Sequence, residues 1–151
     1  MGPIIVITHM KATFVMSNVI PQPHRLNAGQ WENLEADIAG RVGRGGGWAE
    51  RYGSVTVING PVYNQRPATR QLRNRTWIPD ACFSVVLRQE NSHWTSLAFE
   101  MPNASTVTGP VSRYLTTVQT INRETGLDLL AGLPEPEKTK LEVERSSTIW
   151  R

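Results

Sequence analysis

Two runs of apolar and β-branched residues stand close together in this chain, and they constrain its fold more than any other feature. Residues 81–88 and 94–100 flank the turn-prone tripeptide Glu90-Asn91-Ser92. Runs of this length bounded by turn residues are typical of strands, and so short a connection places two consecutive strands antiparallel to each other. The sequence therefore predicts a β-hairpin, and it excludes fibres and long helical bundles.

Further strands are expected on the N-terminal side of this hairpin. Residues 4–8 and 13–17 are short β-branched or aromatic runs, and residues 54–59 alternate valine and isoleucine before they close on Gly60-Pro61. Residues 64–75 are polar, rich in arginine and without hydrophobic period, so they are expected to form an exposed loop.

Two helices are predicted. The first runs from Asn27 to the glycines at 43–47, and the second spans residues 111–124 and stops at Gly126. Three apolar residues define the period of the first helix: Trp31, Leu34 and Ile38.

The length of the chain suits one domain better than two. Its 151 residues are 39% hydrophobic and 19% charged, with 12 Gly and 10 Pro, which is typical of a loop-rich globular protein. We expect a single domain over residues 1–151 that ends in a charged, loosely held tail from 134 to 151.

Neither a membrane segment nor a disulfide is expected. No apolar run approaches the roughly 20 residues that cross a bilayer, and Met1–Thr8 is too short and lacks the basic flank of a signal peptide. The single cysteine, Cys82, cannot form an internal disulfide, and its apolar neighbours suggest a buried thiol. The chain is expected to be soluble, and its compartment stays open.

The positive charge of the chain is mostly arginine. Thirteen of the sixteen basic residues are arginine, a side chain whose planar fork suits phosphate oxygens. Between residues 41 and 90, eight arginines face three acidic residues, whereas from residue 91 onward six bases face seven acids. This pattern favours an anionic partner bound near the middle of the sequence, although solubilising loop arginines would look the same. The arginines singled out as nucleic-acid contacts are Arg41, Arg70, Arg73 and Arg75.

The residues suited to chemistry gather between positions 13 and 35, in TFVMSNVIPQPHRLNAGQWENLE. This segment closely resembles the hallmark of the DNA/RNA non-specific endonucleases, the endonuclease G-like, ββα-metal nucleases. The similarity continues in the family's order over roughly residues 10–133. The matching residues of the hallmark are Ser17-Asn18, Pro21-Gln22, Leu26-Asn27, Trp31 and Leu34-Glu35, and the later matches lie at 57–63, 78–87, 98–103 and 125–128.

The resemblance implies an α+β fold of the ββα-metal (His-Me finger-type) class, a mostly antiparallel sheet with a metal-site helix, here intact or N-terminally truncated. Cleaving a phosphodiester requires an aimed hydroxide, neutralisation of phosphate charge and stabilisation of the departing oxygen, and hydrated Mg²⁺ supplies the last two. By resemblance, Asn27 is the ligand of Mg²⁺ (or Mn²⁺), and Glu35, two helical turns further, accepts hydrogen bonds from water around the ion. Asn18 and Gln22 support this site.

Each of these residues also has an ordinary structural explanation. Asn27 with Gln30 three residues later matches a helix N-cap with its capping box, and spacing alone favours that role until the family resemblance is considered. Glu35 alone would be a solvated helix carboxylate, and Asn18 a turn former at a strand end. The glycines at 43–47 lack a following Lys-Ser/Thr and indicate a flexible connector rather than a phosphate loop.

The general base is the least certain part of this assignment. The family motif D-R-G-H is absent, and the nearest match is His9, followed by methionine as in many family motifs but closer to Asn27 than the family spacing. His24 stands beside the helix start and His93 in a predicted turn, and neither occupies a base position by resemblance. His9 is therefore the candidate catalytic base, and the alternative is a chain without one.

Two functions follow from the sequence. The first is a metal-dependent endonuclease that hydrolyses DNA and RNA without sequence preference, and the second is an inactive or truncated relative that binds nucleic acid without cleaving it. DNA and RNA are the expected partners, and a membrane is not. The sequence does not decide between secreted, periplasmic and mitochondrial location, or whether a homodimer or an inhibitor protein is involved.

Overall fold

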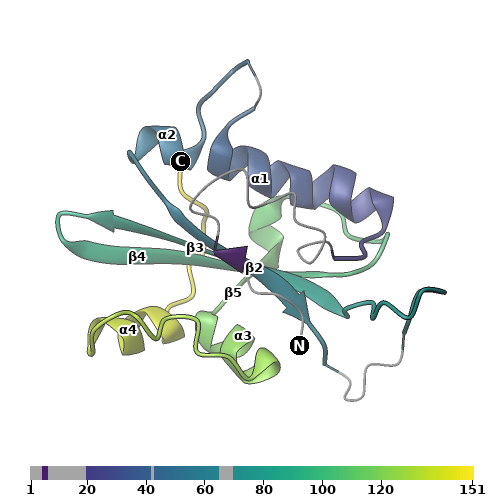
Figure 1. Cartoon of the computed structure of the whole chain (residues 1–151). Coiled ribbons are helices and arrows are strands. Elements are labelled where there is room, and N and C mark those ends of the chain that lie inside the picture. Colours follow the sequence, from purple (N-terminus) through teal and green to yellow (C-terminus); the bar gives the residue numbers. More distant parts are fainter. Residues whose placement is uncertain (1–4, 7–19, 42, 65–69) are drawn as a thin grey trace.

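The computed structural model describes residues 5–6, 20–41, 43–64 and 70–151, and in that part of the chain an antiparallel sheet forms the middle layer (Figure 1). Its five strands lie side by side in chain order. They are β1 (Ile5–Val6), β2 (Thr56–Val62), β3 (Ala81–Glu90), β4 (His93–Pro102) and β5 (Leu115–Thr116). The α+β class expected from the sequence is confirmed.

The β3–β4 hairpin is the predicted one. Its strands pair from Ala81 opposite Pro102 to Glu90 opposite His93. Asn91 and Ser92 close it with φ of 49° and 65°, and a two-residue turn with both φ values positive matches the twist of the strands it joins. Because helices cover both faces of the sheet, residues 81–87 are all buried.

Strand β2 extends further than predicted. The sequence suggested an end at Gly60-Pro61, but the strand continues to Val62, with Pro61 opposite Cys82. Pro61 lies beyond the residues that pair with β1, so the missing N–H of the proline interrupts no hydrogen-bonded ladder among the described strands. At Gly60, an added Cβ would lie 2.7 Å from the Phe83 ring, so this position accommodates no larger residue without a shift of the ring.

The predicted N-terminal helix is present and covers one face of the sheet (Figure 1). It comprises η3 (Leu26–Trp31) and α1 (Glu32–Ala39), and it ends at Gly40, whose φ of 84° suits glycine. Short elements α2 (Trp48–Arg51) and η4 (Val111–Tyr114) lie on the same face. This layer packs on Leu26, Trp31, Leu34, Trp48, Cys82, Val86, Leu97, Phe99 and Met101.

The second predicted helix is only half correct. Helix α3 covers Val118–Thr125, whereas the residues before it form η4 and β5. Leu115 and Thr116 pair with β4, and the Thr117 side chain then accepts a hydrogen bond from Thr120 N to cap α3. Helix α3 and helix α4 (Glu137–Val143) cover the other face of the sheet (Figure 1).

The C-terminal tail was expected to be loosely held, and that expectation is wrong. Leu141 of α4 is fully buried. Beyond α4 the chain returns to α2, where Trp48 Nε1 donates to Trp150 O at 3.1 Å and Tyr52 Oη donates to Arg151 O at 2.7 Å. The Arg88 guanidinium lies over the rings of both Tyr52 and Trp150, at 3.8 and 4.7 Å from the ring centres. No helix of the described residues is long and apolar enough to span a membrane.

Candidate functional site

Asn27 is not the helix cap that its spacing suggested. The helical backbone begins before it, with Arg25 in the cap position, and Asn27 N donates to Pro23 O at 3.1 Å. Its side chain is exposed, and within the described part of the chain it makes no hydrogen bond. The amide oxygen of Asn27 is therefore available to a ligand.

Gln30, the expected partner in a capping box, has a different role. Its Nε2 donates to Gly109 O at 2.7 Å, and its Oε1 accepts a longer hydrogen bond from Asn33 Nδ2 at 3.4 Å. These contacts fasten the helix to the loop before η4. The capping explanation for Asn27 is thus contradicted from both ends of the motif.

A kink separates Asn27 from Glu35. Ala28 (φ −90°, ψ 19°) and Gly29 (φ −128°, ψ −109°) leave helical geometry, and glycine tolerates the second of these conformations. The two residues are therefore not related by the regular two turns that their spacing suggested.

The Glu35 carboxylate is fixed by its own helix. Its Oε1 accepts a hydrogen bond from Trp31 Nε1 at 3.1 Å, and the Trp31 ring is 7% exposed. Although Glu35 is an exposed residue as a whole, partial burial of the carboxylate raises its pKa. The Trp31 hydrogen bond lowers this pKa and the nearby Glu32 charge raises it further. Glu35 thus has a defined orientation and one carboxylate oxygen that has no hydrogen-bond partner among the described residues.

The segment that leads into this helix is anchored to the sheet. Gln22 Nε2 donates to Cys82 Sγ at 3.3 Å. Cys82 is fully buried, as its neighbours predicted, and burial raises its pKa to about 11, so the thiol stays protonated at neutral pH. Asn103, 3% exposed, donates from Nδ2 to Pro21 O at 2.8 Å and to Pro79 O at 3.0 Å. Gln22 and Asn103 therefore hold the start of the helix against β3 and β4.

Two buried polar atoms lie on the face of the sheet that η3 and α1 cover, and the sequence analysis did not predict them. Asn59 of β2 is directly opposite Ser84 of β3, and both lie on the face of Val57 and Val86. Asn59 Oδ1 and Ser84 Oγ are buried atoms that have no hydrogen-bond partner among the residues that the structure describes. The sequence did contain a signal for this pair, because Asn59 and Ser84 are polar residues within two otherwise apolar strands.

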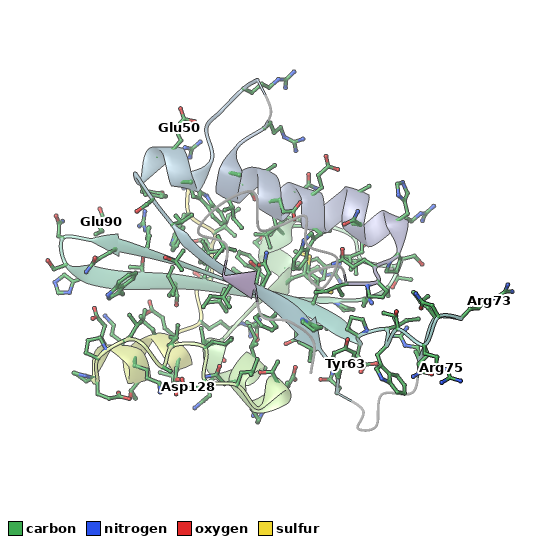
Figure 2. The ribbon with its side chains drawn as sticks, in the orientation of Figure 1. Glu50, Tyr63, Arg73, Arg75, Glu90 and Asp128 are labelled. Atoms are coloured by element: carbon green, nitrogen blue, oxygen red, sulfur yellow. The ribbon has the colours of Figure 1, made fainter. Side chains whose placement is uncertain are left out.

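The predicted arginines do not form one cluster. Arg41, after α1, donates from Nη2 to Asn33 Oδ1 at 3.2 Å. Arg70 donates to Pro79 O at 3.0 Å and lies 3.6 Å from the Asp80 carboxylate. Arg73 and Arg75 project from the opposite end of the molecule, away from the sheet (Figure 2). The structure separates Arg41 from the other three.

Two predicted site residues lie outside the described part of the chain. They are His9, the candidate base, and Asn18. Among the described residues, no group of three His, Cys, Asp or Glu side chains is placed to hold a metal ion. Mg²⁺ prefers oxygen ligands and retains several waters, and the exposed Asn27 amide oxygen is a donor of that type.

Comparison with known proteins places these residues in a family context. The family model described as DNA/RNA non-specific endonuclease matches residues 3–136. The chain is 26% identical over 148 residues to "Nuclease 1, mitochondrial" of Schizosaccharomyces pombe, covering 87% of this chain and 44% of that protein.

Two further relatives show the same pattern of coverage. Identity is 28% over 134 residues with "Nuclease" of Serratia marcescens, covering 83% of this chain and 46% of the relative. It is 29% over 129 residues with "Endonuclease G, mitochondrial" of Homo sapiens, covering 78% and 41%. The chain therefore spans less than half the length of these curated relatives.

Proposed function

Because the chain belongs to the DNA/RNA non-specific endonuclease family, we propose that it acts as a metal-dependent endonuclease, hydrolysing phosphodiester bonds in DNA and RNA without sequence preference. The observation that carries this proposal is the Asn27 side chain, exposed and without a hydrogen bond on a helix whose start is anchored to the sheet. An exposed asparagine that neither caps nor braces its helix is free for a ligand.

Asn27 would hold Mg²⁺ or Mn²⁺ through its amide oxygen, with phosphate oxygens and water completing the coordination. An ion held there would supply positive charge that neutralises the phosphate and stabilises the departing oxygen. Glu35, oriented by Trp31, accepts hydrogen bonds from water in the site through the oxygen that Trp31 does not use.

The remaining residues position the helix that carries Asn27 and move a proton. Gln22 and Asn103 keep the helix start in place by their contacts with Cys82, Pro21 and Pro79. His9 is proposed as the base that takes a proton from the attacking water at a neutral imidazole nitrogen. Asn18 is proposed to support the same site.

The second candidate function is nucleic-acid binding without cleavage. It is favoured by the absence of a D-R-G-H motif from the 151 residues of the sequence. Both candidates would use exposed arginines to bind nucleic acid, so a binding measurement alone does not separate them.

Plasmid nicking with the wild-type chain and His9→Ala separates the two functions. An active enzyme should nick plasmid DNA with Mg²⁺, stop on addition of chelator, and lose about 10²-fold or more in rate in His9→Ala. Its rate should also fall at acidic pH, as the imidazole becomes protonated.

The control is Gln119→Ala, an exposed amide on α3 across the sheet, which should nick at the wild-type rate. A chain that binds DNA but cleaves no faster than its His9→Ala variant would support the binding-only function. Robust, Mg²⁺-dependent cleavage that is unaffected by His9→Ala would instead show that His9 is not the base, and His24 would be tested next.

A further inference from the structure

Between β2 and β3 the chain forms a small hairpin, residues 70–79, which we call the arm. Ile78 N donates to Arg70 O, and Leu72 N donates to Thr76 O, both at 2.9 Å, with Gln71 bridged to Trp77 between them. The turn closes through Arg75 N and Leu72 O at 2.9 Å. The arm therefore has an ordered backbone of its own.

The base of the arm is braced. Asp80 Oδ2 accepts a hydrogen bond from Asn64 N at 3.0 Å, and Asp80 also lies 3.6 Å from Arg70 Nη2. Arg70 in turn donates to Pro79 O. Arg70 is therefore bonded to other groups of the protein, whereas Arg73 and Arg75 lie at the projecting tip of the arm (Figure 2).

At the tip of the arm, the charged residue Arg75 has a backbone conformation that favours glycine. Arg75 has a φ of 66°, the conformation that the last residue of a three-residue hairpin loop adopts. Glycine takes this conformation without steric cost, and arginine does not. An exposed arginine at such a position is unfavourable for the fold, and an unfavourable backbone conformation of this kind points to a role for the side chain.

The arm also exposes a large aromatic ring. Trp77 is 43% exposed, beside a backbone that carries two exposed arginines and no acidic residue between positions 71 and 79. Its cross-strand neighbour is Gln71, a polar and exposed residue. An uncovered indole next to guanidinium groups fits the face of a nucleic-acid base with phosphates on either side.

The arm adjoins the proposed hydrolysis site. One atom, Asn103 Nδ2, donates both to Pro79 O at the base of the arm and to Pro21 O on the segment leading to Asn27. The arm and the start of the helix therefore meet at the same end of the sheet, as Figure 1 also shows. A strand bound at Asn27 can continue onto the arm.

We propose that the arm binds unpaired nucleotides, with Trp77 stacked on a base and with Arg73 and Arg75 on neighbouring phosphates. Bases inside a duplex are already stacked on one another, so the indole is used only where a strand is single or locally opened. The arm thus gives the proposed nuclease a preference for single-stranded substrate, and this inference rests on the proposed function.

Fluorescence anisotropy with labelled 20-nucleotide strands tests the stacking. One probe is oligo-dT and the other is an abasic strand of the same length and charge, both measured at low salt with chelator to prevent cleavage. Trp77→Ala should weaken oligo-dT binding roughly tenfold and leave abasic binding unchanged. Trp77→Phe should retain most of the oligo-dT affinity. The matched control is Val143→Ala on α4, a residue 55% exposed, which should bind both probes as the wild type does.

Arg75→Gly tests the contribution of the Arg75 charge separately from that of the Trp77 ring. It should weaken binding of both probes and reduce the salt dependence of binding by about one phosphate contact, while the melting temperature stays the same or rises. Equal losses on both probes in Trp77→Ala, or no loss on oligo-dT, would overturn the stacking role and leave the proposed function intact. Failure of the wild-type chain to bind either probe would overturn the proposed function as well.

Discussion

Replacing Asn27 by alanine should abolish metal binding, and it should leave the stability of the metal-free protein unchanged or slightly higher. In the structure the residues before Asn27 are already helical. The Asn27 side chain is exposed and makes no hydrogen bond with the described residues. Alanine is the better helix former by up to about 0.7 kcal/mol, so Asn27→Ala should leave the metal-free protein equally stable or slightly more stable. A capping asparagine would instead cost about 0.5–2 kcal/mol when removed.

The metal provides the second half of this test. Mg²⁺ at a hundredfold excess over its Kd should stabilise the wild type by about 2.7 kcal/mol, which for a chain of this size raises the melting temperature by roughly 5–10 °C. This increase should vanish in Asn27→Ala and persist in part in Asn27→Asp. Thermal melts with and without Mg²⁺, together with calorimetric titration, measure both quantities.

Two outcomes would refute the assignment. A loss of 1 kcal/mol or more in metal-free Asn27→Ala, measured by denaturant unfolding, would give Asn27 a structural role that the contacts do not show. Equal stabilisation of wild type and Asn27→Ala by Mg²⁺ would place the ion elsewhere. Gln119→Ala controls for the removal of an exposed helical amide, because it lies on α3 across the sheet.

Two further predictions concern stability. Trp150→Ala should lower the free energy of unfolding by about 1–3 kcal/mol, because it removes the ring that packs on Trp48 and under Arg88; an unchanged urea midpoint would contradict the docking of the tail. Burial, and then repulsion from Glu124, raises the pKa of Glu100 to about 7 from 4.5. The folded state therefore holds a proton that the unfolded state has released, so stability should fall as pH rises from about 4.5 through 7, and Glu100→Gln should reduce that fall in urea titrations at pH 5 and 8.

Local sequence pattern was sufficient where the cause of a structure lies within a few residues. The β3–β4 hairpin follows from two apolar runs and an Asn-Ser turn. The end of the first helix was expected at the glycines 43–47, and the helix ends earlier, at Gly40, which is also a glycine with positive φ. The buried Cys82 was predictable from its apolar neighbours. The hallmark around Asn27 and Glu35 was recognisable because it combines residue types and spacing in one continuous segment.

Contacts between distant segments could not be read from the sequence. Spacing alone allowed Asn27 to be a cap, until the structure placed the start of the helix before it and turned Gln30 toward Gly109. Pairing of Leu115 with β4 divided the expected second helix, since strand pairing satisfied backbone groups that a helix would otherwise have used.

The same limit applies to the tail and to the arm. The C-terminal residues are polar and charged in sequence, yet Trp150 is held by Trp48 and Arg88, which are 102 and 62 positions away. Arg70 and Arg75 look alike in sequence, but only the first has Asp80 beside it. Residue types and their order determined the family and the local elements, whereas the tertiary structure decided which polar groups are used internally and which face a ligand. That division exists because a side chain's partners depend on packing between segments that the local pattern does not specify.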